Sequence, residues 1–341
     1  MFKDKLKELA KGKKLSEQEA SEMMDEIMEG KVSPCQVAGF LSILSLRGET
    51  VDELAGSVRS MRAHARPLNY DKELVDIVGT GGDGTATFNI STAGAIVLSS
   101  LGVNVAKHGN RSVSSTSGAA DALEALGVSI QSTPEQAASL LDRTHMAFLF
   151  APLYHASMKY AAQPRRELGF RTIFNMLGPL TNPAGAERQL LGVYNREVAQ
   201  AYAETVLKLG TRRTLVVTGE DGMDELTIAG KTHAFLIENN EIRHFSIEPE
   251  DVGLSSGDLN DIQVENPQES AQLIEKIFSG SSVNQTAVNA VLLNAGAGLY
   301  VAEKTGSIAE GVHLARQAVD QGLARKQLEL LRLETKEVTH V

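Results

Sequence analysis

Short β-rich runs alternate with helical stretches from Leu74 onward, and this alternation constrains the fold more than any other feature of the sequence. Alternation of this kind predicts a mainly parallel sheet flanked by helices, an α/β fold. The expected strands are residues 74–80, 103–109, 128–131, 147–152, 190–194 and 214–219. The expected helices between them are at about 91–101, 119–126, 134–144 and 196–209.

The C-terminal third of the chain shows two further patterns. Residues 232–247 have the alternation of a hairpin that turns at Asn239–Asn240, because asparagine tolerates the left-handed backbone of a tight turn. Three helices are expected after it, at about 267–278, 285–303 and 307–333, the last with a break near Gly322.

The first 65 residues predict a small bundle of helices. Three pairs have the spacing of a capping box, in which two side chains satisfy free N–H groups at a helix start: Ser16 with Glu19, Ser33 with Gln36, and Thr50 with Glu53. Residues 165–185 are rich in glycine and proline with few strand signals, so we expect them to leave the sheet and pack on these helices. The predicted helical domain is therefore discontinuous (1–68 and 163–188), and the predicted α/β domain contains residues 69–162 and 189–341.

The formal net charge of −10 argues against a general nucleic-acid binder, which needs clustered basic residues. A local pocket of backbone N–H groups and a few cations can still hold a small anion. The single cysteine, Cys35, excludes an internal disulfide and a cysteine-based zinc site, and no apolar stretch reaches the length of a membrane span. We expect a cytoplasmic protein in which Cys35 packs in a helix core.

A glycine-rich stretch, VDIVGTGGDGTATFNIST, follows the first expected strand at residues 75–92. Glycines let a ligand approach backbone N–H groups, and the helix that begins after them favours negative charge. The spacing fits neither G-x-G-x-x-G nor G-x-x-x-x-G-K-[ST]. The stretch therefore predicts an anion site of another kind; the alternative is a turn that only joins a strand to a helix.

A second loop with anion-binding character, KHGNRSVSSTSG, follows the second expected strand at residues 107–118. In a right-handed β-α-β unit both strand ends face the same crevice, so the two loops should open onto one site. Together they predict a ligand with two phosphate groups. The alternative for the serine run is a solvated, flexible loop.

An acidic pair, Asp224 and Glu225, follows the expected strand 214–219 and should reach the same edge of the sheet. Diphosphates usually bind with Mg²⁺, which prefers oxygen ligands and keeps several waters. Ser91 adds a hydroxyl beside the first loop. The pair predicts a magnesium site, although an adjacent Asp-Glu pair is more often surface charge.

Five segments, taken together, resemble the anthranilate phosphoribosyltransferase family: GTGGD at 79–83, NIST at 89–92, KHGNR at 107–111, RRELGFRTIFNMLGPLTNP at 165–183 and DGMDEL at 221–226. The resemblance covers nearly the whole chain. It implies a small helical domain and a larger α/β domain, as in nucleoside phosphorylases, and a homodimer formed through the helical domains. It also implies transfer of a phosphoribosyl group from phosphoribosyl pyrophosphate to anthranilate, with release of pyrophosphate, in tryptophan biosynthesis.

The resemblance also implies the residues of the site. Those expected at phosphoribosyl pyrophosphate are Gly79, Gly82, Asp83, Thr87, Asn89, Ile90, Ser91, Thr92, Lys107, His108, Gly109, Asn110, Arg111, Ser112, Val113, Ser114 and Ser115. Those expected at anthranilate are Gly79, His108, Asn110, Pro152, His155 and Arg165, with packing or capping as the alternative role of His155. The expected Mg²⁺ ligands are Ser91, Asp224 and Glu225, and the expected catalytic residues are Lys107, Asn110 and Arg165.

The reaction that the resemblance implies needs no nucleophile from the protein. The aromatic amine is itself the nucleophile, so positioning and electrostatic stabilisation should supply most of the catalysis. Two alternatives remain: a pyrimidine nucleoside phosphorylase, which would use free phosphate and a nucleobase, and a non-catalytic relative that binds nucleic acid. Arg165 favours a substrate with a carboxylate, and the acidic charge of the chain disfavours nucleic acid.

Overall fold

The computed structural model describes residues 1–112, 117–281 and 284–339. Within these ranges the centre of the molecule is a seven-stranded sheet in the order β3-β2-β1-β4-β5-β6-β7. The strands are β1 (Val75–Gly79), β2 (Val105–Gly109), β3 (Met146–Phe150), β4 (Arg188–Gly192), β5 (Arg213–Gly219), β6 (Thr232–Glu238) and β7 (Glu241–Ile247). Strands β1 to β5 are parallel and the last two pair antiparallel. The predicted mainly parallel sheet is confirmed.

The strand predicted at 128–131 is wrong, because these residues form a connection between two helices. Val128 and Ile130 are buried, so the apolar alternation is real. The backbone bonds elsewhere, however: the Val128 N–H donates to the Leu123 carbonyl, and the Ser129 N–H donates to the Thr335 hydroxyl. The alternating buried side chains of this segment therefore belong to a packed loop, because no neighbouring strand pairs with its backbone.

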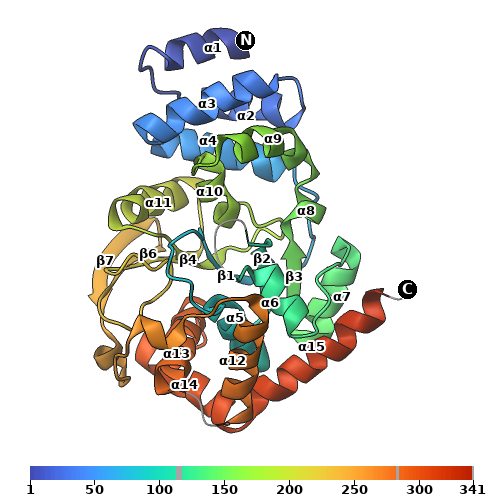
Figure 1. Ribbon diagram of the computed structural model, residues 1–341, viewed down its shortest axis with the longest axis vertical. Coiled ribbons are helices and arrows are strands. Elements are labelled where there is room, and N and C mark those ends of the chain that lie inside the picture. Colours follow the sequence, from blue (N-terminus) through green and yellow to red (C-terminus); the bar gives the residue numbers. More distant parts are fainter. Residues whose placement is uncertain (113–116, 282–283, 340–341) are drawn as a thin grey trace.

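Helices cover both faces of the sheet (Figure 1). On one face α5 and α13 pack on β1 and β4, and α14 and α15 pack on these helices. On the other face α11 covers β5 and β6, and α7 packs on β3. Helices α6 and α12 pack on each other. The helices of this part are α5 (Ile90–Ser100), α6 (Ala119–Ala125), α7 (Pro134–Thr144), α11 (Arg196–Leu209), α12 (Pro267–Ser279), α13 (Gln285–Val301), α14 (Ile308–Asp320) and α15 (Leu323–Thr339).

Two local predictions in the C-terminal third are confirmed. The β6–β7 hairpin turns at Asn239 and Asn240, whose φ angles are +51° and +61°. Gly322, with a φ of +68°, separates α14 from α15. Both turns need the left-handed backbone that asparagine and glycine adopt at least cost.

The N-terminal residues form a helical bundle, and all three predicted capping boxes are present at its helix starts. The bundle contains α1 (Phe2–Leu9), α2 (Glu17–Met28), α3 (Pro34–Arg47) and α4 (Val51–Ala63). Cys35 is exposed, so its predicted burial is wrong. It lies in the first turn of α3, whereas the buried stripe of this helix consists of Val37, Phe40, Leu41 and Leu44.

Two later helices pack on this bundle. Helix α9 (Lys159–Leu168) packs on α2 and α3, and α10 (Ile173–Leu177) packs on α3 and α4. Figure 1 shows all six at one end of the molecule, with the sheet between them and α12 to α15. The short elements are α8 (Ala151–Tyr154) and the 3₁₀ turns η1 (Ala156–Met158), η2 (Gly178–Leu180), η3 (Pro249–Val252) and η4 (Leu259–Ile262). In the described part of the chain, no helix is both long and apolar enough to cross a membrane.

Candidate active site

A cavity of about 590 Å³ lies at the carboxyl ends of the parallel strands, between the sheet and the helical bundle. The chain runs from β1 through β2 to β3 on one side of β1, then returns to β4 on the other side and continues to β7, so the strand order reverses between β1 and β4. The crevice at such a reversal is the usual ligand site of an open α/β sheet. Its walls come from both parts of the molecule, including Met61 of α4 and Arg165 of α9.

Most of the predicted site residues line this cavity. They are Gly79, Gly82, Asp83, Thr87, Asn89, Ser91, Lys107, His108, Gly109, Asn110, Arg111, Ser112, Pro152, His155, Arg165, Asp224 and Glu225. Ile90 and Thr92 are buried in the first turn of α5 and do not line it. Val113, Ser114 and Ser115 lie outside the described residues.

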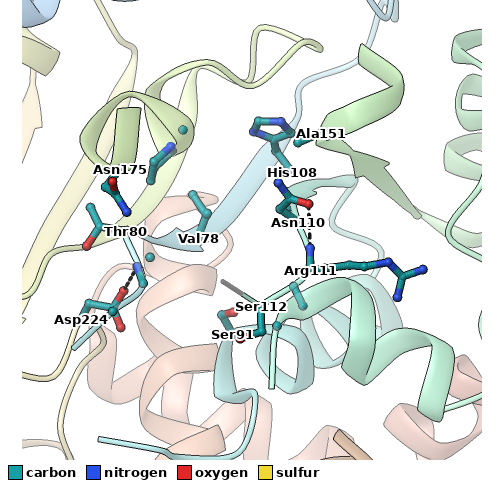
Figure 2. A pocket seen from close by; sticks show the side chains of 18 of the residues that line it. Val78, Thr80, Ser91, His108, Asn110, Arg111, Ser112, Ala151, Asn175 and Asp224 are labelled. Atoms are coloured by element: carbon teal, nitrogen blue, oxygen red, sulfur yellow. Dashed lines mark hydrogen bonds between the residues drawn. The ribbon is translucent and has the colours of Figure 1, made fainter. Parts of the chain in front are cut away.

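The glycine-rich loop after β1 wraps around the acidic pair. Gly81 and Gly82 have φ angles of +70° and +74°, which favour glycine. The Gly81 N–H donates to Asp224 Oδ2 at 2.6 Å, as Figure 2 shows. A Cβ on Gly79 would lie 2.3 Å from the same oxygen. Bare backbone at Gly79 is therefore what allows the carboxylate to lie against the loop.

The first turn of α5 connects the acidic pair to Lys107. Asn89 caps the helix, because its Oδ1 accepts from the Thr92 N–H at 3.0 Å. The Ser91 N–H donates to Glu225 Oε1 at 3.0 Å, and the Ser91 hydroxyl accepts from Lys107 Nζ at 3.0 Å. Ser91 thus holds one carboxylate through its backbone and one cation through its side chain.

Lys107 is a buried cation at the end of β2. Its Nζ donates to the Ile77 carbonyl at 2.6 Å and to the Ser91 hydroxyl. Burial lowers the pKa of Lys107 to about 8, and the negative charges of Asp76 and Glu225 oppose that effect. An ammonium has three protons, and within the described residues only two have partners, so the third is available to an anion in the cavity.

The acidic pair is electrostatically suited to a divalent cation. Burial, followed by the neighbouring Asp83, raises the pKa of Asp224 to about 7. Burial and Asp224 raise the pKa of Glu225 well above its usual range. Glu225 Oε2 is buried and has no hydrogen-bond partner among the residues that the structure describes. A bound cation would relieve both the mutual repulsion and this unsatisfied oxygen.

The number of protein ligands fits Mg²⁺ rather than a metal held by the protein alone. The described residues include no group of three or more His, Cys, Asp or Glu side chains that could hold a metal. Two carboxylates and the Ser91 hydroxyl leave coordination positions for substrate oxygens and water, which is how Mg²⁺ usually binds.

The opposite side of the cavity carries aromatic side chains and, from α9, the cations Lys159 and Arg165. Arg165 stacks on the Phe174 ring, with its guanidinium carbon 5.2 Å from the ring centre. Burial lowers the pKa of Arg165, and its guanidinium has no ion pair or hydrogen bond within the described parts of the chain. A stacked, unpaired guanidinium is suited to bind a planar carboxylate through two hydrogen bonds.

Two histidines lie side by side on this wall, with ring centres 5.2 Å apart. Burial lowers the pKa of His108 to about 3, so this ring is neutral near pH 7. His155 Nε2 bonds to the Thr181 carbonyl at 3.0 Å, and burial lowers its pKa as well. His155 therefore both packs and lines the cavity, so its two predicted roles are compatible.

Arg111 was predicted to bind the ligand, but its guanidinium is directed away from the centre of the cavity (Figure 2). Its guanidinium binds Asp121 and Glu124 and lies over the Phe150 ring. Figure 2 shows the side chain directed away from Ser91 and the centre of the cavity. Its charge is already neutralised by two carboxylates, which the sequence spacing did not indicate.

Several cavity residues were missed by the sequence analysis. The hydroxyls of Thr80 and Ser117 are buried without a hydrogen-bond partner among the described residues, and both residues line the cavity. Asn175 of α10 also lines it and is labelled in Figure 2. Thr80 and Ser117 belong to the two predicted loops, so their position in these loops could have marked them as candidate site residues. Asn175 lies in the segment 165–183 that carries the family resemblance, but nothing in the sequence singled it out within that segment.

A buried carboxylate, Asp76 of β1, lies behind the cavity and gives a prediction of pH dependence. Burial raises its pKa from 3.8 to about 6, partly opposed by Lys107. The folded protein therefore keeps this proton up to about pH 6, whereas the unfolded chain loses it near pH 4. The stability of the wild type should fall by about 3 kcal/mol relative to Asp76→Asn between these values and stay level above them. Melting temperatures of both proteins at pH 4, 5, 6 and 7 measure this; a constant difference would contradict it.

Comparison with known proteins assigns the family. A model described as "Glycosyl transferase family, a/b domain" matches residues 71–325, and one described as "Glycosyl transferase family, helical bundle domain" matches residues 3–65. Anthranilate phosphoribosyltransferase from Geobacillus sp. (strain WCH70) is 53% identical over 334 residues, 98% of each chain. The chain belongs to the anthranilate phosphoribosyltransferase family. The resemblance inferred from the five segments is thereby confirmed.

Solved structures of anthranilate phosphoribosyltransferases have the same fold. The crystal structure of the enzyme from Thermus thermophilus is 44% identical with a TM-score of 0.91, covering 97% of this chain and 99% of that chain. The enzyme from Saccharomyces cerevisiae, in complex with phosphoribosyl pyrophosphate and Mg, is 27% identical with a TM-score of 0.91, covering 98% of both chains. A small helical part joined to a larger α/β part is therefore the architecture of the family.

Proposed function

We propose that this chain transfers the 5-phosphoribosyl group of phosphoribosyl pyrophosphate to the amine of anthranilate, giving N-(5-phosphoribosyl)anthranilate and pyrophosphate. The observation that carries this proposal is that one cavity contains two loops suited to phosphate, an acidic pair suited to Mg²⁺, and an arginine, Arg165, that stacks on an aromatic ring and has no ion pair among the described residues. Relatives that match the chain over its full length are named for this reaction.

The sheet side of the cavity would hold phosphoribosyl pyrophosphate. Residues 79–83 and 107–112 line this side and would surround the pyrophosphate, and the Lys107 ammonium, which donates two hydrogen bonds within the described residues, would give its third to a pyrophosphate oxygen. Asp224, Glu225 and the Ser91 hydroxyl would hold Mg²⁺, which when bound neutralises charge on the pyrophosphate. The Thr80 and Ser117 hydroxyls, buried without a partner among the described residues, would supply two further hydrogen bonds.

The helical side would hold anthranilate. Arg165 binds its carboxylate, and the ring packs against Pro152, His108 and His155. Asn110, which Figure 2 shows beside His108, orients the amine. The amine nitrogen forms a bond to the ribosyl C1 as the bond from C1 to the pyrophosphate oxygen breaks, the electron pair of that bond leaves with the pyrophosphate, and the amine loses one proton to solvent. Because His108 is neutral, it places no positive charge beside the attacking amine.

We further propose that the protein is cytoplasmic and that its domain boundaries lie near residues 68, 163 and 188. We also propose that it forms a homodimer through the helical bundle. Leu46 of α3 is 91% exposed and Phe170 is 47% exposed. The Ser45 hydroxyl donates to the Arg171 carbonyl at 2.9 Å, so the two apolar side chains belong to one region of the surface. Sedimentation velocity tests this: a dimer mass supports it, and a monomer at micromolar concentration contradicts it.

One assay tests the reaction. Anthranilate fluorescence should fall when enzyme, phosphoribosyl pyrophosphate and Mg²⁺ are combined, and should fall much more slowly when the metal is chelated. Thymidine with inorganic phosphate is the control for a nucleoside phosphorylase. Consumption of thymidine without loss of anthranilate would overturn the proposal.

Arg165→Ala should mainly weaken anthranilate binding. Loss of a charged hydrogen-bonding partner costs about 1.5–3 kcal/mol, which corresponds to an increase of about 10–150-fold in KM for anthranilate. The KM for phosphoribosyl pyrophosphate and kcat should change about threefold or less, because Arg165 lies on the opposite wall. Arg166→Ala is the matched control, since Arg166 is exposed and does not line the cavity. A large loss of kcat at unchanged KM would contradict this role.

A further inference from the structure

Asn182 lies buried in the segment that returns from α10 to β4, just after the last residue of this segment that lines the cavity. Its Nδ2 donates to Asp76 Oδ2 at 2.8 Å and to the Ala106 carbonyl at 2.8 Å. Its Oδ1 accepts from the Ala184 N–H at 2.9 Å. The amide is thus fully used in fastening the return segment to β1 and β2.

Asp76 is the partner of this amide on the central strand. It is completely buried, and its second oxygen accepts from the His108 N–H at 3.2 Å. One carboxylate therefore contacts both the return segment and the strand end that carries His108. Neither Asp76 nor Asn182 lines the cavity, so any influence on a ligand must pass through their neighbours.

The residues that this contact fastens are those of the anthranilate wall. Gly178, Pro179 and Thr181 line the cavity directly before Asn182. The Thr181 carbonyl bonds to His155, whose ring lies beside that of His108. The contacts of Thr181 with His155 and of Asn182 with Asp76 therefore both fasten the C-terminal end of this wall, while Gln189 of β4 donates to the Pro179 carbonyl nearer its start.

We propose that Asp76 and Asn182 are positioning residues for the acceptor: their hydrogen bond sets the wall formed by residues 178–181 and His108 at the distance from Arg165 that an aromatic acid requires. This inference rests on the proposed function and assigns a role in it to two residues that touch no substrate. Loss of the contact moves the wall and weakens acceptor binding.

The phosphoribosyl pyrophosphate side should be much less sensitive to Asn182. The glycine-rich loop is held by Asp224, and the start of α5 is held by Asn89 and Glu225, none of which contacts Asn182. A change at Asn182 keeps the carboxyl group of Asp76, although loss of this hydrogen bond raises the pKa of Asp76 further. Because the charge of Asp76 acts on Lys107, KM for phosphoribosyl pyrophosphate is the readout that separates the geometric role of the contact from this electrostatic effect.

The test is a comparison of both KM values in Asn182→Ala and the wild type. We expect KM for anthranilate to rise about tenfold or more, KM for phosphoribosyl pyrophosphate to change less than about threefold, and kcat to change less than about threefold. Gln327→Ala is the matched control, because Gln327 is a buried amide on α15 that donates to the Thr144 carbonyl and does not line the cavity. This control should lower the melting temperature without changing either KM.

A rescue experiment distinguishes positioning from a general loss of stability. Asn182→Asp places two carboxylates in contact and should raise KM for anthranilate further. The exchange Asp76→Asn with Asn182→Asp restores the hydrogen bond with its donor reversed, so it should recover part of that loss. If Asn182→Ala does not fold, Asn182→Ser is used instead, since its hydroxyl can still donate toward Asp76. The same changes in the two KM values and in kcat are expected for it.

The outcomes separate this inference from the proposed function. A wild type without turnover refutes the function. If the wild type turns over normally, the inference is refuted when Asn182→Ala leaves KM for anthranilate unchanged. It is also refuted when KM for anthranilate and KM for phosphoribosyl pyrophosphate rise together. Failure of the exchange to improve on Asn182→Asp would also count against it.

Discussion

Lys107→Ala should lower kcat by about 10²–10³-fold while KM for anthranilate changes little. Removing a preorganised donor from a site of developing charge has a cost of this size. Lys107 is held at the cavity by Ile77 and Ser91, so its ammonium is in position before the substrate arrives. Negative charge grows on the pyrophosphate as its bond to the ribosyl C1 breaks. Loss of the cation therefore destabilises the transition state more than the bound substrates.

Lys107→Met is the better control for packing, because it keeps most of the buried volume and removes only the charge and the hydrogen bonds. Steady-state kinetics and melting temperatures of both variants test the prediction. If Lys107→Met retained more than about a tenth of the wild-type kcat, the proposed role of Lys107 would be wrong.

The double variant Asp224→Asn, Glu225→Gln should lose more than about 10²-fold in kcat and should no longer respond to Mg²⁺. Its melting temperature without metal should equal or exceed that of the wild type. The reason is that burial and the neighbouring Asp83 make the ionised pair unfavourable in the folded protein. Loss of activity together with unchanged or increased stability is not the pattern of a structural defect.

Two measurements test the double variant. Kinetics at increasing Mg²⁺ should give a saturable rise for the wild type and a flat line for the variant. Thermal melts with phosphoribosyl pyrophosphate should show stabilisation by Mg²⁺ only in the wild type. Wild-type metal dependence in the variant would show that the metal binds elsewhere. Asp221, an acidic residue of the same turn that hydrogen-bonds to Thr227 and does not line the cavity, offers the control Asp221→Asn.

The parts of the fold that could be predicted depend on short-range chemistry. Capping boxes such as Ser16 with Glu19 need only local backbone geometry, and the Asn239–Asn240 turn needs only a tolerated φ. The convergence of the two loops was also predictable, because parallel strands joined by a right-handed crossover bring their ends together. The strand predicted at 128–131 failed because burial alone does not provide a hydrogen-bonding neighbour.

The parts of the site that could not be predicted depend on contacts between distant residues. The two carboxylates that neutralise Arg111 come from a helix whose orientation relative to the loop is a tertiary property. The bond between Asp76 and Asn182 joins residues 106 positions apart. Asn175 reaches the cavity only because α10 packs on the helical bundle.

Calorimetric titration of the protein with phosphoribosyl pyrophosphate tests most directly whether the two loops and the acidic pair form one binding site. With Mg²⁺ present we predict a saturable heat with one site per chain, which becomes much weaker when the metal is chelated and in the Asp224→Asn, Glu225→Gln variant. Absence of binding heat with Mg²⁺, or equal affinity in the wild type and this variant, would contradict the account.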